Sequence, residues 1–163
     1  MNALAVAGWL QRAGWLTVAL LLLALSRSVS AADAEPRVAL VIGNAAYADA
    51  PLRNPVNDAR EMSKTLRALG FTVLAHENVG KRAMEQAVLE FGRRIAAGGV
   101  GLIYYAGHGM QVRGRNYLVP VDARIVDEAG TRVAAVDIDL LLEQISSARN
   151  RVNVVILDAC RNN

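Results

Sequence analysis

Short apolar runs alternate with longer amphipathic segments along most of this 163-residue chain, and this alternation restricts the fold more than any other feature. Continuous apolar runs are typical of strands buried on both faces, and apolar side chains at helical spacing indicate helices that cover them. We predict strands at residues 37–44, 71–79, 102–110 and 151–160, and helices at residues 56–69, 81–97 and 137–148. The order predicts an α/β fold with a mostly parallel sheet flanked by helices.

The first 34 residues differ in composition from the rest. Residues 15–25 (WLTVALLLLAL) form an apolar stretch too short for a membrane span, and small residues follow at 28–34 (SVSAADA). The pattern predicts a signal peptide over residues 1–34 and a domain over residues 35–163. An uncleaved membrane anchor is the alternative, because residues 3–9 (ALAVAGW) lengthen the apolar stretch. In both cases the segment engages the export machinery or the membrane, and we expect a periplasmic, secreted or membrane-anchored protein.

The charge balance argues against nucleic acid as a partner. The chain has 18 Lys and Arg, of which Arg12 and Arg27 fall in the predicted signal peptide, and the remaining 16 nearly balance the 14 Asp and Glu outside that segment. These basic residues form no cluster, whereas nucleic-acid binding needs a clustered basic face. The chain also lacks a glycine-rich phosphate loop, and one cysteine with two dispersed histidines argues against a zinc site. We therefore expect no metal and no resident cofactor.

Two of the predicted strands end near reactive side chains, His108 and Cys160. Parallel strands present their carboxyl ends at one edge of a sheet, about 4.8 Å apart, so a thiol and an imidazole can meet there as nucleophile and base. The N–H groups of Gly109 and Cys160 are candidates for an oxyanion hole. The alternative is a turn histidine in a glycine-rich loop and a buried cysteine that acts as a small apolar side chain. A lone cysteine has no partner for an internal disulfide.

Cys160 follows His108 by 52 residues, and the motifs around both resemble those of caspase-like cysteine peptidases. The matching stretches, within residues 37–161, are RVALVIGNAAY, LRNPVNDAREMSKTLRALGF, LIYYAGHG, NYLVPVD and VVILDACR. The chain is similar to the catalytic large (p20) subunit of this clan, and within it to bacterial metacaspase-like (orthocaspase) members. The resemblance implies a three-layer caspase-like fold, a polypeptide substrate, and a dyad with His108 as base and Cys160 as nucleophile.

The resemblance also implies a basic substrate. Metacaspase-like enzymes carry one acid two residues before the nucleophile and another in an NDA motif, which Asp158 and Asp58 match here. Two carboxylates in one pocket favour a basic side chain, so we predict cleavage after Arg or Lys. Structural alternatives stay open for both acids, because Asp58 has capping-box spacing to Glu61 and Asp158 could orient a loop. Arg53 leaves a preference for substrate aspartate open, since an arginine binds aspartate in caspases.

Further expectations concern residues near the two motifs and the end of the chain. Asn44 and Tyr47 should shape the functional edge, and one of Tyr104 and Tyr105 should reach toward the site while the other packs in the core. Caspase-like folds add the strands of a small subunit after the nucleophile, whereas this chain ends three residues after Cys160. A small-subunit-like segment or chain is therefore expected as a partner, and a non-catalytic interaction module is the alternative function. Calcium activates many metacaspase-like relatives, but the resemblance identifies no ligands here.

Overall fold

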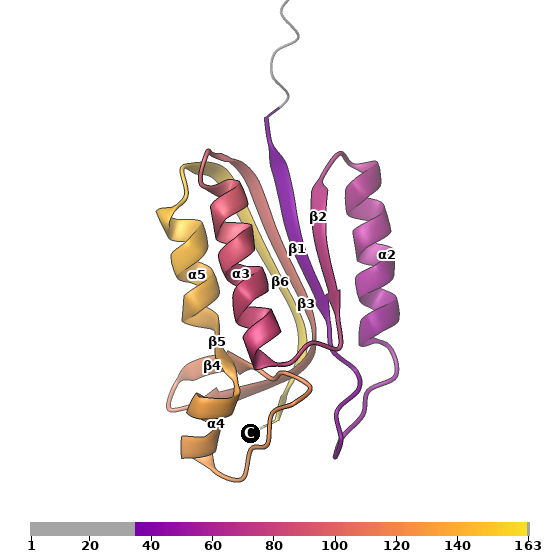
Figure 1. Cartoon of the computed structure of the whole chain (residues 1–163), viewed down its shortest axis with the longest axis vertical. Helices are drawn as coiled ribbons and strands as arrows, with labels where there is room; N and C mark the ends of the chain where they lie inside the picture. The colour runs from indigo at the N-terminus through magenta and orange to yellow at the C-terminus, as the bar shows by residue number, and fades with distance from the viewer. Residues whose placement is uncertain (1–34, 163) are drawn as a thin grey trace, which may run out of the picture. The chain divides into compact units, whose positions relative to one another are not determined.

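Four parallel strands form most of the sheet, at the places where the apolar runs predict them (Figure 1). The computed structural model describes residues 35–162. The parallel strands are β1 (Arg37–Gly43), β2 (Thr72–Glu77), β3 (Gly99–Val112) and β6 (Asn150–Asn162). β1 pairs with β2 and β3, and β6 pairs with β3. The predicted signal peptide lies outside the described residues, and none of the described helices is long and apolar enough to cross a membrane.

β3 continues past its predicted end into a hairpin. Its last residues pair antiparallel with β4 (Arg115–Leu118), and β4 pairs antiparallel with β5 (Val136–Asp137). Arg113 and Gly114 at the turn have φ values of 51° and 80°, as a two-residue type I′ hairpin requires. Pro120 lies just beyond β4, where its missing N–H removes no ladder hydrogen bond.

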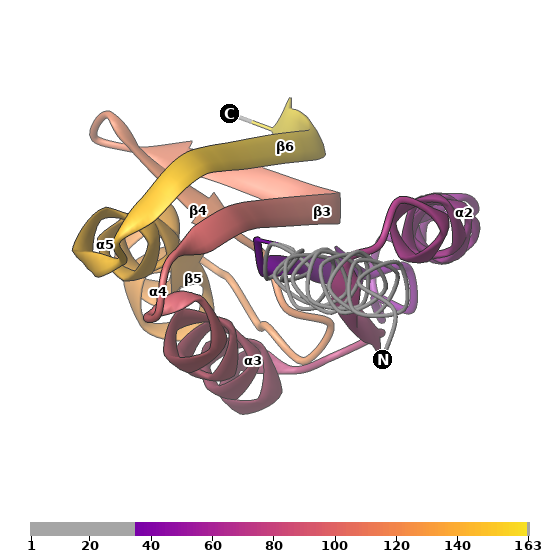
Figure 2. The same cartoon turned by 90° about the horizontal axis from the view of Figure 1, so that it is seen from above.

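The helices cover the sheet from both sides. α3 (Lys81–Ile95) and α5 (Ile138–Ser147) lie on one face, and α2 (Pro55–Ala68) lies on the other (Figures 1 and 2). These three helices correspond to the predicted ones within a few residues. The short helix α4 (Glu128–Ala134) and strand β5 were not predicted, because the segment between β4 and α5 has no clear apolar period.

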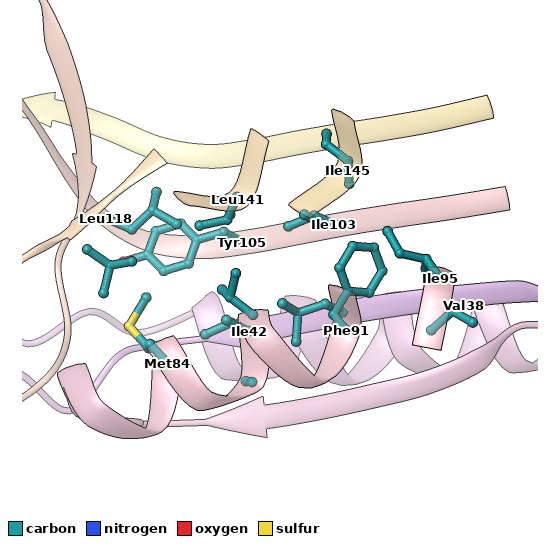
Figure 3. Close-up of a cluster of buried hydrophobic side chains, with 14 residues drawn as sticks. Val38, Ile42, Met84, Phe91, Ile95, Ile103, Tyr105, Leu118, Leu141 and Ile145 are labelled. Atoms are coloured by element: carbon teal, nitrogen blue, oxygen red, sulfur yellow. The ribbon is translucent and has the colours of Figure 1, made fainter. Parts of the chain in front are cut away.

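The main core lies between the sheet and the layer formed by α3 and α5 (Figure 3). Its fully buried members include Leu40, Ile42, Met84, Val88, Phe91, Ile103, Tyr105, Leu118, Val136 and Leu141. A smaller cluster, which contains Ala39, Val41, Ala59, Leu66, Leu102, Tyr104 and Ala106, lies under α2. Tyr105 and Tyr104 therefore pack on opposite faces of β3, as their alternation in the sequence predicts.

β6 is the least covered of the parallel strands. α2 packs on β1, β2 and β3, and Figure 2 shows no helix over the same face of β6 among the described residues. Val152, Val154 and Ile156 are 44%, 38% and 37% exposed. On the other face, Val155 and Ala159 pack against the main core. β6 is thus joined to the molecule through β3 and through one face only.

Candidate active site

His108 and Cys160 occupy matching positions in neighbouring strands. The parallel ladder between β3 and β6 pairs His108 with Cys160, and adjacent strands lie about 4.8 Å apart. The backbones of the predicted base and nucleophile are therefore adjacent. His108 lies inside β3, which runs on to Val112, so the alternative of a turn histidine in a glycine-rich loop is wrong. Antiparallel pairing with β4 keeps this glycine-rich stretch extended.

The loop after β1 holds the imidazole of His108 from two sides. The ring Nε2 lies 2.7 Å from the carbonyl oxygen of Ala50. The ring also lies against that of Tyr47, with centroids 4.5 Å apart. Because a carbonyl oxygen can only accept a hydrogen bond, Nε2 carries the proton. Nδ1 of the neutral ring then has the free lone pair, which is what a general base needs.

Two tyrosine hydroxyls hold the backbone of His108. The Tyr47 hydroxyl accepts a hydrogen bond from the His108 amide at 3.0 Å, and the Tyr105 hydroxyl donates to the His108 carbonyl at 2.8 Å. The two hydroxyls are 3.2 Å apart, and each lies 3.0 Å from the carbonyl oxygen of Val119. Burial raises the pKa of both tyrosines, so both remain protonated donors. The backbone position of His108 is therefore fixed on both sides of the residue.

Gly107 makes room for this pair of hydroxyls. A Cβ at position 107 would lie 2.6 Å from the Tyr105 oxygen and 2.7 Å from the Tyr47 oxygen. Real Cβ atoms do not approach other atoms this closely. Glycine is therefore needed before His108, because two side chains approach the backbone closely there.

Asn44 ties the loop after β1 to two other segments. Its side chain is fully buried, and its amide oxygen accepts from the Val79 amide at 2.9 Å. Its amide nitrogen lies 3.2 Å from the carbonyl oxygen of Val79 and 3.4 Å from that of Val119. A buried amide with partners for both its donor and its acceptor costs free energy to disrupt. These contacts agree with the prediction that Asn44 and Tyr47 shape this edge of the sheet.

The two predicted specificity residues lie near one hydroxyl on the α2 side of the sheet. The Tyr104 hydroxyl donates to Asp158 Oδ2 at 3.4 Å. Burial raises the pKa of Tyr104 to about 12, and the negative charges of Asp158 and Asp58 add to the rise. Asp158 therefore has a contact on the sheet surface rather than in a loop, and the charge of Asp58 contributes to the raised pKa of Tyr104.

Asp58 reaches this place because α2 begins against the end of β1. A Cβ at Gly43 would lie 2.5 Å from the Pro55 carbonyl oxygen and 2.7 Å from the Ala59 Cβ, so only glycine allows this approach. The N-cap residue of α2 is Asn54, and no side chain caps the helix. The capping-box alternative for Asp58 is therefore wrong, because the helix begins before it.

Comparison with known proteins now identifies the family. A family model described as the caspase domain matches residues 36–163. The chain belongs to the caspase family. This confirms the expected α/β, caspase-like fold and makes the chain a domain of the cysteine-peptidase type. A crystal structure of a Geobacter sulfurreducens protein matches it with a TM-score of 0.61 over 77% of this chain and 51% of that one, at 19% identity, which supports the fold alone.

Two curated relatives are similar in sequence to this caspase domain. The human mucosa-associated lymphoid tissue lymphoma translocation protein 1 is 36% identical over 129 residues, which are 78% of this chain. The mouse homologue of that protein matches with the same identity and coverage. In both cases the match covers 15% of the relative, so the similarity extends to one domain of much longer proteins.

The predicted oxyanion donors of the caspase domain lie inside the sheet. Gly109 is paired with Leu118 of β4 on one side and with Arg161 of β6 on the other. An amide engaged in a ladder cannot donate to an oxyanion at the same time. The oxyanion role of Gly109 and Cys160 therefore stays a prediction, and it requires β6 to separate from β3 at this level.

No metal site is identified among the side chains of the described residues. Within residues 35–162, no three side chains of His, Cys, Asp or Glu come together as a metal ion would need. Calcium activation of this domain stays a prediction without assigned ligands.

One member of the site carries no signal in the sequence. The contact to His108 Nε2 comes from the backbone carbonyl of Ala50, and any residue type could provide it. The polar pair of Tyr47 and Tyr105 has a weak signal, because each tyrosine follows an apolar run on the functional edge.

Proposed function

We propose that this caspase domain is a cysteine endopeptidase with His108 as base and Cys160 as nucleophile. The imidazole takes the thiol proton, and the sulfur attacks the carbonyl carbon of a peptide bond. The C–S bond forms, the C–N bond breaks, and the imidazolium gives its proton to the leaving amine. Water then hydrolyses the thioester with His108 again acting as base, which releases the acyl part as a carboxylic acid.

The pairing of His108 with Cys160 in adjacent strands is the observation that supports this dyad. The Ala50 carbonyl adds to the support, because it favours the tautomer in which Nε2 carries a proton and Nδ1 is free. The same contact becomes a charge-assisted hydrogen bond once the ring is protonated, which stabilises the imidazolium. The amides of Gly109 and Cys160 are proposed to receive the oxyanion after local separation of the two strands.

We further propose that Asp58 and Asp158 bind an Arg or Lys side chain on the acyl side of the cleaved bond. Asp158 accepts a hydrogen bond from the Tyr104 hydroxyl, the charges of both carboxylates add to the raised pKa of Tyr104, and neither forms an ion pair with another described residue. A guanidinium can bind carboxylates in a bidentate manner. A pocket for substrate aspartate built on Arg53 is less favourable, because Asp158 would repel that substrate.

The test uses the full chain on matched fluorogenic peptides that end in Arg, Lys or Asp. We expect cleavage after Arg and Lys, and a loss of roughly 1,000-fold or more in kcat for Cys160→Ala and for His108→Ala. Asp158→Asn and Asp58→Asn should lower kcat/KM for the Arg peptide by about 10-fold or more, as expected for loss of a charged partner. Glu61→Gln, on the next turn of α2, is the matched control and should change little.

Three results would contradict parts of the proposal. Activity that survives Cys160→Ala would contradict the proposed dyad. A preference for the Asp peptide would remove the proposed roles of Asp58 and Asp158. A folded chain that binds peptides but cleaves none of them would instead favour a non-catalytic interaction module.

We also propose that a small-subunit-like segment or chain covers β6. Among residues 35–162, β6 is paired on one side only, and several of its aliphatic side chains are exposed. An unpaired edge with apolar side chains can take up a further strand. Addition of such a partner to the assay should raise kcat, and Ile156→Lys should weaken that activation.

Export of the domain is a separate proposal. The apolar residues 15–25 and the small residues that follow support a periplasmic, secreted or membrane-anchored location. Fractionation of expressing cells, with N-terminal sequencing of the recovered protein, distinguishes a cleaved signal peptide from an anchor.

A further inference from the structure

A cavity of about 450 Å³ opens beside His108. Residues 47–50 after β1, residues 108–110 of β3 and several residues of the segment 119–125 after β4 form its walls. The Val119 amide donates to the His108 carbonyl, and the Val121 amide donates to the Val79 carbonyl. These bonds place the 119–125 segment on the β1 side of β3, whereas β6 pairs on the other side. His108 therefore lies between this cavity and the strand that carries Cys160.

This position relates the cavity to one half of a peptide substrate. In thiol-dependent cleavage the acyl half stays bonded to sulfur, and the other half leaves with a proton from the imidazolium. The nitrogen of the leaving residue must come within hydrogen-bond reach of the histidine ring. The side chain of that residue is attached to the next atom along the chain, so it must also lie close to the ring. The cavity on the far side of His108 from Cys160 is where such a side chain can go.

Part of the cavity wall is aliphatic. Met110, Val121 and Ile125 are partly buried, and Val119 is 7% exposed. A volume of about 450 Å³ lies within the range of roughly 300–1,000 Å³ that small-ligand pockets have. It is therefore large enough for one bulky side chain together with adjoining backbone.

Charged side chains also line the cavity. They are the carboxylates of Asp49 and Asp122 and the guanidinium of Arg124. One oxygen of Asp122 accepts from the Lys81 amide, and its other oxygen is not used in that bond. Cleavage creates a new α-amino group on the leaving residue, which is protonated near neutral pH. The carboxylates outnumber the guanidinium, so the charge of the cavity suits that ammonium group.

We propose that this cavity is the subsite for the first residue on the leaving side of the cleaved bond and that it takes a bulky aliphatic side chain. The inference rests on the proposed peptidase function and adds a second specificity determinant to it. The site that contains Asp58 and Asp158 selects for positive charge in the residue before the cleaved bond. This cavity selects for size and apolar character in the residue after it. The step needs no reactant beyond the peptide and water.

The experiment uses internally quenched peptides that are identical up to an Arg and differ in the next residue, which is Leu, Gly or Asp. We expect kcat/KM for Leu to exceed that for Gly by about 10-fold or more, which is the usual effect of a filled apolar pocket. Ala123→Phe fills the cavity and should bring the Leu/Gly ratio close to one. Val126→Phe is the matched control, because Val126 is 96% exposed and does not line the cavity.

A second variant and a product-inhibition measurement support the same test. Ile125→Ala removes part of the aliphatic wall and should lower the Leu/Gly ratio by about 3-fold or more. The dipeptide Leu-Gly-amide should inhibit, whereas its N-acetylated form should inhibit at least about 3-fold more weakly, because it lacks the ammonium group. Asp49→Asn should reduce that difference.

The outcomes separate this inference from the peptidase proposal. Cleavage after Arg that depends on Cys160 but has a Leu/Gly ratio near one would overturn the subsite and leave the peptidase standing. A ratio that Ala123→Phe and Ile125→Ala do not change would overturn it as well. Cleavage that is absent, or that does not depend on Cys160, would overturn the peptidase and this inference with it.

Discussion

The two strands that carry the proposed dyad are built differently at the same level of the sheet. β3 has strands on both sides near His108, and Tyr105 and Ile103 are fully buried while Tyr104 is 5% exposed. β6 is paired with β3 alone among the described strands, and Ile156 and Leu157 are 37% and 42% exposed. The base is therefore held by contacts that the domain already contains. The strand of the nucleophile is held from one side, so its final geometry depends on what covers β6.

The largest expected difference between the two strands is in the free energy of unfolding that is lost when an apolar side chain at each strand is truncated. Phe91 of α3 is fully buried under β3, and Phe91→Ala should lower the free energy of unfolding by about 3–5 kcal/mol. Ile156 is partly exposed on β6, and Ile156→Ala should cost about 1 kcal/mol or less, because less apolar surface is lost. Urea unfolding of both variants measures the difference as a shift in midpoint at unchanged slope. Equal losses would mean that β6 is as well covered as β3.

The next effect concerns the close packing before His108. Gly107→Ala would place a Cβ within 2.7 Å of both tyrosine hydroxyls and force them apart. We expect a loss of about 1–3 kcal/mol in stability and a loss of roughly 10-fold or more in kcat, as for other misplaced catalytic groups. Gly70→Ala is the control, because Gly70 has a φ of 82° at the end of α2 and no atom near its Cβ. It should destabilise through backbone strain while kcat stays unchanged. A drop in kcat for both variants would attribute the effect to stability.

A smaller effect is expected from loss of the Tyr47 hydroxyl, which holds the backbone of the base His108. Tyr47→Phe keeps the ring that lies against His108 but removes the acceptor for the His108 amide. The buried amide then lacks its partner, which should cost about 1–2 kcal/mol in stability and lower kcat more than it changes KM. Tyr117→Phe is the matched control, since Tyr117 is also buried but the backbone of His108 bonds to Tyr47, Tyr105 and Val119 instead. Equal kcat values for the two variants would show that the Tyr47 hydroxyl does not position His108.

The parallel strands and main helices could be predicted because each has a strong local pattern. The apolar run at β1 and the helical spacing of Met84, Val88 and Phe91 on α3 are visible without any tertiary contact. The extension of β3 beyond residue 110, its predicted end, could not be predicted in this way. Glycines at positions 107 and 109 indicate a loop locally, and only pairing with β4 and β6 keeps the segment extended. α4 and β5 were missed because the segment between β4 and α5 has no clear apolar period.

The candidate site likewise contains residues that the sequence indicates and a contact that it does not indicate. His108, Cys160, Asp58 and Asp158 have side chains whose chemistry and order in the sequence point to a site. The Ala50 carbonyl has no such signature, because its contact with His108 depends on the path of a loop. The competing capping role of Asp58 also could not be removed from sequence, because Asn54 and Glu61 both allow a helix start nearby. The close approach of α2 to Gly43 decides where the helix begins.

The smallest effect is expected on the β6 side, at high pH. The folded-state pKa of Tyr104 is raised to about 12, above its usual value near 10, so the folded protein keeps a proton that the unfolded chain has lost in this interval. Stability from this group is fully present below pH 10 and is lost as pH rises toward 12. Tyr104→Phe removes the group and should reduce the fall in stability between pH 10 and 12, while near neutral pH it should cost about 1 kcal/mol or less for one long, partly buried hydrogen bond. Thermal unfolding from pH 8 to pH 11.5 measures this, with Tyr117→Phe as control. An unchanged alkaline profile would mean that burial and the charges of Asp158 and Asp58 do not raise the pKa of Tyr104 in solution, and this would remove the electrostatic support for the proposed site for a basic side chain.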